Sequence, residues 1–385
     1  MVIFKSCVEG FAGFLRGEVG FTIRSLLLYY ICNSSMVTNR KIYKSDFLII
    51  SMELDDSYNI AGQRASITST LSYLDPSQHP YKEYNDHIIA YNSSLQNKLA
   101  RDFDKLFPNS EGFVIGATGS DGRFEKGPAS LIELLVFEDI LGSSQDATQS
   151  LKHYMVAHKD YFFDNLEVKL VGAGKLSECV IHGGTPSEVR LISPNRIFDS
   201  HLLYGSRGLH RKVKEALGSE LNSEDGRSIV DRIKDKVREH RKITLNGTQR
   251  YKGSSLVHYE PDRGIAHYNP EENLYSFKQG PLRAVQYALV RDIIKKIKED
   301  PSFEFPVLPT NTVCKLRYLE VEGQTALSST QVTDLSDCYK YFLHLYHLAQ
   351  NAYQKDSVSE TVFDARDVKE RCKAVDSICT SSIIK

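Results

Sequence analysis

The stretch GSDGRFEKGPASLIELLV, residues 119–136, decides how the rest of the chain is read. It follows the apolar run GFVIGA and ends in a second apolar run, so the pattern predicts two strands joined by a Gly-Ser turn. Glu133 lies in the second run, and Leu131 stands two positions before it. Because alternate residues of a strand face the same way, a partner carboxylate for Glu133 would be expected at position 131. The stretch therefore has one acidic residue on the predicted strand, whereas a catalytic site of this kind would need two.

The turn itself has the residue types that bind phosphate. A glycine lets the backbone approach phosphate oxygens closely, and a serine hydroxyl and exposed N–H groups can donate hydrogen bonds to them. An arginine beside the turn can neutralise phosphate charge, although an arginine in a solvated loop is the plain alternative. The candidate residues for binding a nucleotide are Gly119, Ser120, Gly122 and Arg123.

The same stretch resembles the polymerase-β-like nucleotidyltransferase superfamily, within it the branch of the bacterial PII-protein uridylyltransferases and their relatives. Those proteins carry Gly-Ser, then Gly-Arg-x-Glu, then Pro-x-Ser-Asp-Ile-Asp-Leu-Leu. The residues that match without a gap are Gly119, Ser120, Gly122, Arg123, Glu125, Pro128, Ser130, Ile132, Leu134 and Leu135. The resemblance implies a small catalytic sheet whose carboxylates hold Mg²⁺ against a nucleoside triphosphate (NTP), since a hard cation needs oxygen ligands.

The sequence departs from the family pattern where the chemistry lies. Leu131 replaces the first metal-binding Asp, and Glu133 replaces the second with a longer acid that could still reach a metal ion. Leucine cannot coordinate Mg²⁺, and nucleotidyl transfer depends on electrostatic positioning by the metals. The resemblance also implies a third carboxylate on a later strand, for which Glu167 and Glu188 are candidates; a solvent-facing strand residue is the alternative for each. Glu133 is thus the candidate catalytic residue, and Glu133, Glu167 and Glu188 are the candidate metal ligands.

Two later stretches resemble segments of the same family. Residues 192–213, ISPNRIFDSHLLYGSRGLHRKV, resemble the segment after the catalytic sheet, where an Arg or Asp and a Leu-Leu-x-Gly turn precede a helix. Residues 276–294, SFKQGPLRAVQYALVRDII, resemble a Lys-x-Gly-Pro-Gly-Gly-Leu-Arg-Asp segment that opens the helical domain. The matching residues of this segment are Lys278, Gly280, Pro281, Leu282 and Arg283. The two inner glycines are missing and Ala284 replaces the final Asp, so this likeness is looser than the first.

The chain is long enough for more than one domain, since 385 residues exceed the usual size of a single core. Hydrophobic periodicity and the resemblance together predict an α/β (α+β) protein, in which a small mixed-sheet nucleotidyltransferase-like domain is flanked by helical N-terminal and C-terminal regions. The predicted regions are an uncertain extension at 1–51, a helical region at 52–108, the nucleotidyltransferase-like domain at 109–206, a helical domain at 207–355 and a polar tail at 356–385.

Bulk composition narrows the partners and the compartment. A formal net charge of −1 gives no overall attraction to nucleic acid or acidic membranes, so no nucleic-acid binding is expected. The seven cysteines are scattered and form no Cys-x-x-Cys pair, which favours a reducing compartment and a cytoplasmic location. No stretch reaches the roughly 18 to 20 apolar residues of a membrane helix, so no transmembrane segment is expected. The expected partner is a nucleotide, with a protein as an alternative.

Two functional hypotheses follow from these residues. The first is a catalytically degenerate nucleotidyltransferase-fold protein that binds a nucleotide or a protein partner, and Leu131 is the observation behind it. The second is an active Mg²⁺-dependent enzyme that transfers a nucleoside monophosphate from NTP to a hydroxyl of a protein or small molecule. It would use Glu133 together with Glu167 or Glu188. A structural interaction protein that shares only the turn is the third reading. The sequence favours the first hypothesis, and a second acid close to Glu133 would favour the second.

Overall fold

The computed structural model describes the chain from Tyr81 onward, with gaps. The described residues are 81–108, 112–128, 130–139, 145–158, 166–170, 178–183, 185–191, 194–222, 226–246, 259–260, 265–268, 277–300, 303–356, 359–362 and 365–385. All of them belong to one compact unit, Arg64–Lys385. The predicted extension at 1–51 and the first part of the predicted helical region, 52–80, lie outside the described residues.

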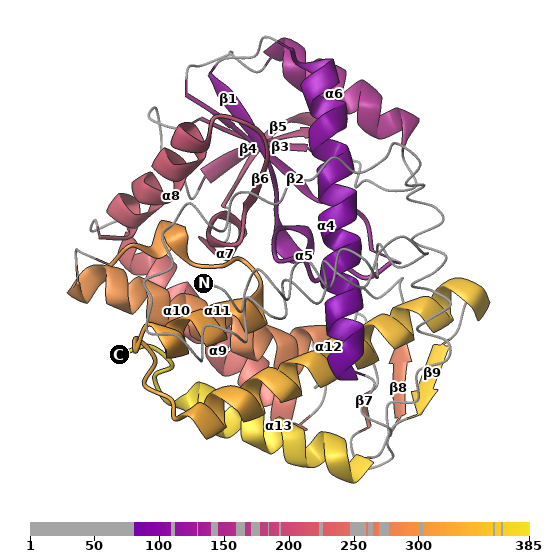
Figure 1. Ribbon diagram of the computed structural model, residues 1–385, viewed down its shortest axis with the longest axis vertical. Coiled ribbons are helices and arrows are strands. Elements are labelled where there is room, and N and C mark those ends of the chain that lie inside the picture. Colours follow the sequence, from indigo (N-terminus) through magenta and orange to yellow (C-terminus); the bar gives the residue numbers. More distant parts are fainter. Residues whose placement is uncertain are drawn as a thin grey trace, which may run out of the picture. The chain divides into compact units, whose positions relative to one another are not determined.

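A six-stranded sheet, drawn at the top of Figure 1, has the strand order β5-β4-β3-β2-β1-β6. Its strands β2 and β3 run parallel, and every other neighbouring pair runs antiparallel, so the sheet is mixed. The strands are β1 (Phe113–Ala117), β2 (Leu134–Glu138), β3 (Leu166–Leu170), β4 (Glu178–Gly183), β5 (Thr185–Leu191) and β6 (His201–Gly205).

The neighbouring strands β1 and β2 are buried along their whole length. Every residue of both strands is buried, which is why their sequences, FVIGA and LLVFE, are almost continuously apolar. The register pairs Ile115 with Val136 and Ala117 with Leu134. The Gly-Ser turn follows the end of β1, and Glu133 directly precedes the start of β2. Because the two strands pair antiparallel, the turn and Glu133 lie next to each other.

The long helix α4 (Tyr81–Leu106) runs beside the sheet and reaches α12 (Ser329–Asp356) (Figure 1). Its buried residues recur at helical spacing, among them Ile88, Leu95 and Leu99. The helix contacts β6 as well as α12, so it touches both the sheet and the helical part of the structure.

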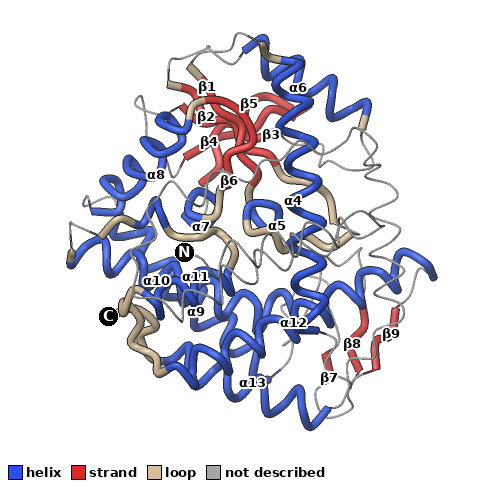
Figure 2. The backbone as a smooth tube through the Cα atoms, viewed as in Figure 1, coloured by secondary structure: helices blue, strands red, loops and turns tan. Residues whose placement is uncertain are grey.

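Helices gather at the end of the described structure opposite the six-stranded sheet (Figure 2). A second, antiparallel sheet has the order β7-β8-β9. The remaining elements are α5 (Gly119–Gly122), α6 (Gln145–Ala157), α7 (Pro194–Phe198), α8 (Arg207–Asn222), α9 (Gly226–Asn246), β7 (Tyr259–Glu260), β8 (Ile265–Tyr268), α10 (Arg283–Glu299), α11 (Thr312–Val321), β9 (Ser359–Val362) and α13 (Ala365–Thr380). The described residues thus confirm the α+β class that the sequence predicts.

A kinked turn, the π-helical segment η3 (Lys278–Leu282), precedes α10. Gly280 within it has the non-helical angles φ −91° and ψ −105°. Pro281 follows and has no N–H to continue the helical hydrogen bonding. The ring of His240 donates a hydrogen bond from Nδ1 to the backbone oxygen of Gln279, which holds the kink against α9.

The prediction of a polar tail at 356–385 needs correction. Residues 365–380 form the helix α13, and its apolar residues are buried at helical spacing: Val368, Cys372, Val375 and Cys379. Ile383 and Ile384 beyond the helix are buried too. The many charged residues between these positions conceal the apolar stripe in the sequence, because they occupy the solvent-facing side of the same helix.

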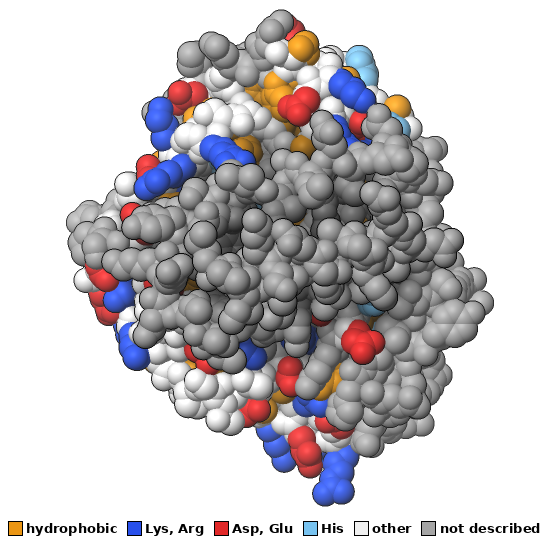
Figure 3. All heavy atoms as spheres, in the orientation of Figure 1, with side chains coloured by type: hydrophobic (Ala, Val, Ile, Leu, Met, Phe, Trp, Pro, Cys, Tyr) orange, Lys and Arg blue, Asp and Glu red, His pale blue; other side chains and the backbone are white. Residues whose placement is uncertain are grey.

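Side chains of both charge signs are interspersed where the described surface is visible in Figure 3. Among the helices that the structure describes, none combines the length and the apolar character needed to cross a membrane.

Candidate functional site

The Gly-Ser turn forms a short helical turn, α5, directly after β1. Gly119 has a φ of +62°, a left-handed conformation that favours glycine. A Cβ at this position would lie 2.8 Å from Oε2 of Glu133, so the Glu133 carboxylate lies directly against the turn. Gly119 and Ser120 are both partly exposed. The structure therefore brings two predicted nucleotide-binding residues and the predicted catalytic acid together at one accessible place.

The other two predicted nucleotide-binding residues lie deeper. Gly122 is buried, and a Cβ there would approach the backbone oxygen of Asp199 to 2.1 Å and that of Ala117 to 2.8 Å. Glycine is thus required at this position by close backbone packing alone. Arg123 is 8% exposed, and its guanidinium belongs to a buried network described below. These contacts favour a structural role for Gly122 and Arg123.

Glu133 lies one residue before β2, with its side chain 34% exposed. Its carboxylate accepts a hydrogen bond from Nη2 of Arg196 at 2.9 Å, and the two form an ion pair. Buried Thr118 ties the two partners together: its N–H donates to the Glu133 carbonyl at 3.1 Å, and its hydroxyl donates to the Arg196 carbonyl at 2.8 Å. Leu131 is partly exposed nearby in the sequence and supplies no oxygen ligand.

A second carboxylate does approach Glu133, and it comes from the turn. Oδ2 of Asp121 accepts a hydrogen bond from the backbone N–H of Glu133 at 3.1 Å. Burial raises the pKa of Asp121 to about 7, while the nearby charge of Lys126 opposes the shift. Strand alternation does not predict Asp121 as a partner acid for Glu133, because Asp121 lies in the turn and not on a strand. An acid inside the turn itself was the signal that could have found it.

Positive side chains from the second and third family-like stretches complete the site. Arg196 comes from the stretch 192–213 and pairs with Glu133. Lys278 comes from the kinked turn η3, is partly exposed, and has its Nζ 5.6 Å from the centre of the Tyr346 ring. Burial lowers the pKa of Lys278 to about 8, helped by the charge of Arg283 and opposed by Glu133. The sequence showed Lys278 and Arg283 as family matches, but it did not assign them to the site.

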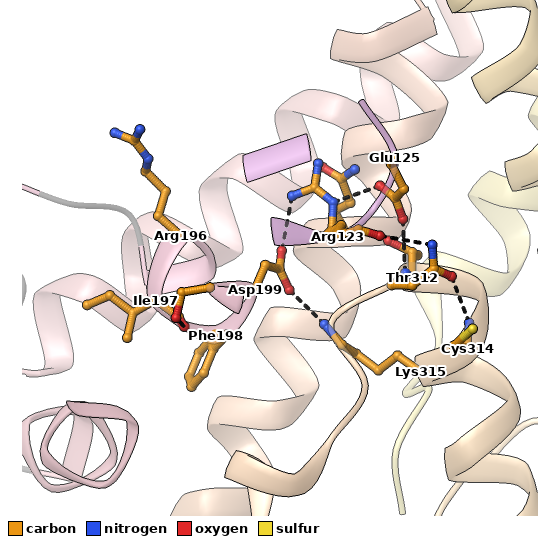
Figure 4. Close-up of polar contacts among 12 residues, drawn as sticks. Arg123, Glu125, Arg196, Ile197, Phe198, Asp199, Thr312, Cys314 and Lys315 are labelled. Atoms are coloured by element: carbon orange, nitrogen blue, oxygen red, sulfur yellow. Dashed lines mark hydrogen bonds and ion pairs between the residues drawn. The ribbon is translucent and has the colours of Figure 1, made fainter. Parts of the chain in front are cut away.

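A buried polar network lies behind the turn (Figure 4). Nε of Arg123 donates to Glu125 at 2.7 Å, and Nη1 donates to Asp199 at 3.1 Å. Asp199 also accepts from Nζ of Lys315 at 2.7 Å, and Glu125 accepts from the hydroxyl of Tyr339 at 2.7 Å. The Gly-Arg-x-Glu part of the motif thus joins the sheet to α11 and α12.

The start of α11 closes this network from the helical side. The N–H of Thr312 donates to Glu125 at 2.9 Å, and Nδ2 of Asn311 donates to the carbonyl of Arg123 at 3.0 Å. Figure 4 shows Asp199 pointing into the network and Arg196, three residues earlier, pointing away from it. Arg196 on the short helix α7 therefore supplies the accessible site, and Asp199, directly after the end of this helix, supplies the buried network.

The candidate third carboxylates are placed by backbone register. Glu167 lies on the neighbouring strand β3. It pairs with Leu135 of β2, which is two residues beyond Glu133. Glu188 lies on β5, three strand spacings from β2, or roughly 14 Å at the usual spacing. The backbone therefore favours Glu167 over Glu188 as the nearer acid. The side chains of both residues lie outside the described part of the chain.

Among the residues that the structure describes, no three His, Cys, Asp or Glu side chains are grouped as a metal site would require. Comparison with protein-family models and with curated proteins gave no match for this chain.

Proposed function

We propose that this protein is a nucleotidyltransferase-like protein that binds the phosphate groups of a nucleotide and no longer catalyses transfer. The convergence of three family-like stretches carries this proposal. The turn at 119–122, Arg196 and Lys278 come from the three separate stretches. The turn lies against the carboxylate of Glu133, Arg196 forms an ion pair with it, and Lys278 interacts with it electrostatically. A turn shared by chance would not be expected to collect the other two stretches around it.

The charges around the turn suit a polyanion. Arg196, Lys278 and Arg283 contribute positive charge, whereas Glu133 and Asp121 contribute negative charge. Burial keeps Asp121 largely protonated below about pH 7, so the site has a positive balance near neutrality. Guanidinium and ammonium groups form strong, charge-assisted hydrogen bonds to phosphate oxygens.

The loss of transfer activity is proposed from the acids. Position 131 offers a leucine where the family has a metal ligand, and Glu133 is held by Arg196. One observation favours the alternative of an active, Mg²⁺-dependent transferase: Asp121 stands beside Glu133 as a second carboxylate. In that alternative, Asp121 and Glu133 together would take the place of the strand pair.

Labelled NTPs and Mg²⁺ test both possibilities. We expect calorimetry to detect NTP binding and the transfer assay to detect no labelled product. Replacing Lys278 with Met should weaken binding roughly 10- to 150-fold, since a hydrogen bond to a charged group contributes about 1.5–3 kcal/mol. Lys295→Met is the matched control, because Lys295 is an exposed lysine on the adjacent helix α10 and pairs with Glu299.

The outcomes separate the two hypotheses. Transfer by the wild-type protein that is lost in both Glu133→Gln and Asp121→Asn would establish the active alternative. Gain of transfer in Leu131→Asp, in a wild-type background that binds but does not transfer, would support the degenerate reading. An absence of NTP binding by the folded wild-type protein would refute the proposed function.

A further inference from the structure

We infer that the site binds its polyanionic ligand without a divalent cation, because Arg196 and Lys278 supply the positive charge that a metal ion would otherwise supply. This inference rests on the proposed function and goes further, since it names the form of the ligand: the free polyphosphate anion, and not its Mg²⁺ complex.

The first support is that Glu133 already has a cationic partner. Nη2 of Arg196 lies 2.9 Å from Oε2 of Glu133, within ordinary hydrogen-bonding distance. Thr118 hydrogen-bonds the backbone of both residues and is fully buried, so the fold holds their backbones at positions from which the two side chains reach each other. A metal ion would have to displace the guanidinium to use this oxygen.

The second support is a further cation, Lys278. Lys278 interacts electrostatically with both Glu133 and Asp121. A divalent ion bound by these acids would be repelled by the like charges of Lys278 and Arg196. A polyphosphate ligand meets the same two cations as attractive partners.

The third support is the residue at position 131. Leu131 provides no oxygen, and it is partly exposed beside Glu133, which is two positions away. A hard cation such as Mg²⁺ demands several oxygen ligands in near-octahedral geometry. The strand face thus offers one carboxylate, and that carboxylate is paired with an arginine.

The ion pair can open for a ligand. The side chains of Arg196 and Glu133 are 27% and 34% exposed, and a pair with this much water contact contributes only about 0–1 kcal/mol. A phosphate group that accepts two hydrogen bonds from the guanidinium can therefore replace the carboxylate as its partner.

Calorimetric titration with tripolyphosphate and with ATP, each in a chelating buffer and in MgCl₂, tests the inference on the full chain. We expect binding in the chelator to be at least as tight as in MgCl₂. Arg196→Met should weaken binding in the chelator about 10-fold, and Arg196→Lys should restore part of the loss. Arg238→Met, at an exposed ion pair on α9, should have no effect.

Glu133→Gln gives a result of opposite sign for the two kinds of site. In a metal-free site it removes the carboxylate that competes for Arg196, so binding should stay equal or become tighter. In a metal-dependent site the same change removes a metal ligand and weakens binding.

Binding that appears only with MgCl₂ would overturn the inference and leave the proposed function intact. Binding in the chelator that Arg196→Met does not change would also overturn it. An absence of binding in both buffers would overturn the inference and the proposed function together. Circular dichroism tests whether each variant is folded. If Arg196→Met does not fold, Arg196→Lys is used in its place.

Discussion

Asp121 is a carboxylate that the fold keeps out of water. It is 2% exposed, and burial raises its pKa to about 7. A buried acid of this kind lowers the stability of the folded state whenever it is ionised, because the unfolded chain ionises it at lower pH with no such penalty. Its presence in the turn is therefore easier to explain by what it does at the site than by stability.

Asp121→Asn should raise the free energy of unfolding at about pH 8. The folded pKa of about 7 lies above the ordinary value of 3.8, so the penalty grows as pH rises between these values and is complete above the higher one. We expect a gain of about 2–4 kcal/mol at about pH 8 that shrinks toward about pH 5, measured by urea unfolding. Asp104→Asn, at an exposed position on α4, is the matched control. Loss of stability in Asp121→Asn at about pH 8 would contradict the argument.

Binding of anions should weaken as pH rises through the range where Asp121 and Lys278 titrate. Asp121 gains a negative charge near about pH 7, and Lys278 loses its positive charge near about pH 8. Sulfate is a suitable probe, since its own charge is constant, and its affinity should fall between about pH 6 and pH 9. An affinity that stays constant over that range would refute this dependence.

Gly122→Ala should destabilise the protein by about 2 kcal/mol or more, since the added Cβ would overlap the backbone oxygen of Asp199 and neither backbone can move easily. Gly208→Ala is the matched control. Gly208 is exposed in α8, where the added methyl group meets only Ser206 Oγ at 3.4 Å, so this change should be neutral or stabilising by up to about 1 kcal/mol. Thermal unfolding compares the two, and equal melting temperatures would contradict the packing argument.

At the residue scale, the sequence could locate Glu133 and the Gly-Ser turn but not the residues around them. Strand alternation and the motif spacing point to Glu133 directly. Asp121 escaped because its importance comes from burial and from the N–H of Glu133, and neither is visible in a turn sequence. The role predicted for Arg123 depended on exposure, and the structure encloses its side chain between Glu125 and Asp199.

At the scale of elements, the buried network fastens the strand–turn unit to α11 and α12. Its members hydrogen-bond one another in the interior, where a charge left without its partner is costly. The helix α4 adds contacts from another side: Nδ2 of Asn92 donates to the carbonyl of Lys126 at 3.0 Å, and Nε2 of Gln96 donates to that of Asp121. The position of the turn is thus set by three helices.

Arg123→Met should cost about 3–5 kcal/mol of unfolding free energy, because it leaves Glu125 and Asp199 buried without their common partner. Arg238→Met removes an exposed pair and should stay within about 0.5 kcal/mol of wild type. Chemical denaturation measures both. Similar stabilities for the two variants would show that the network contributes little.

Periodicity indicated helical regions at 52–108 and 207–355, because burial on one face of a helix leaves a regular pattern of apolar residues, as in α4 and α10. It missed α13, where charged residues hide a narrow apolar stripe. The kink at Gly280 also escaped, since it depends on His240 of a distant helix in addition to the local Gly-Pro pair.

At the scale of the described structure, the network makes the sheet and the helices depend on one another. Hydrogen exchange should show this in Arg123→Met. Faster exchange is expected together in residues 119–125 and 311–316, which share the network, while α13 should exchange as in wild type. Increased exchange confined to 119–125 would mean that the two parts open independently.

The sequence predicts the α+β class, because the apolar runs of strands and the periodicity of helices can be read directly along the chain. It does not predict that Asp121 and Arg196 both contact Glu133 or that Lys278 interacts with it electrostatically, since these interactions depend on packing between elements far apart in the chain. Family resemblance gave the order of the three stretches but not their proximity.

The ion pair between Glu133 and Arg196 also has a consequence for selectivity. A carboxylate fixed beside a guanidinium is a tethered competitor, present at a high effective concentration for every anion that arrives from solution. Chloride and other monovalent ions make single weak contacts and compete poorly against it. Polyvalent anions that contact several cations at once gain more binding free energy, and they can displace the Glu133 carboxylate from Arg196. For the proposed anion-binding function, this pair would disfavour monovalent anions such as chloride and favour polyvalent ligands.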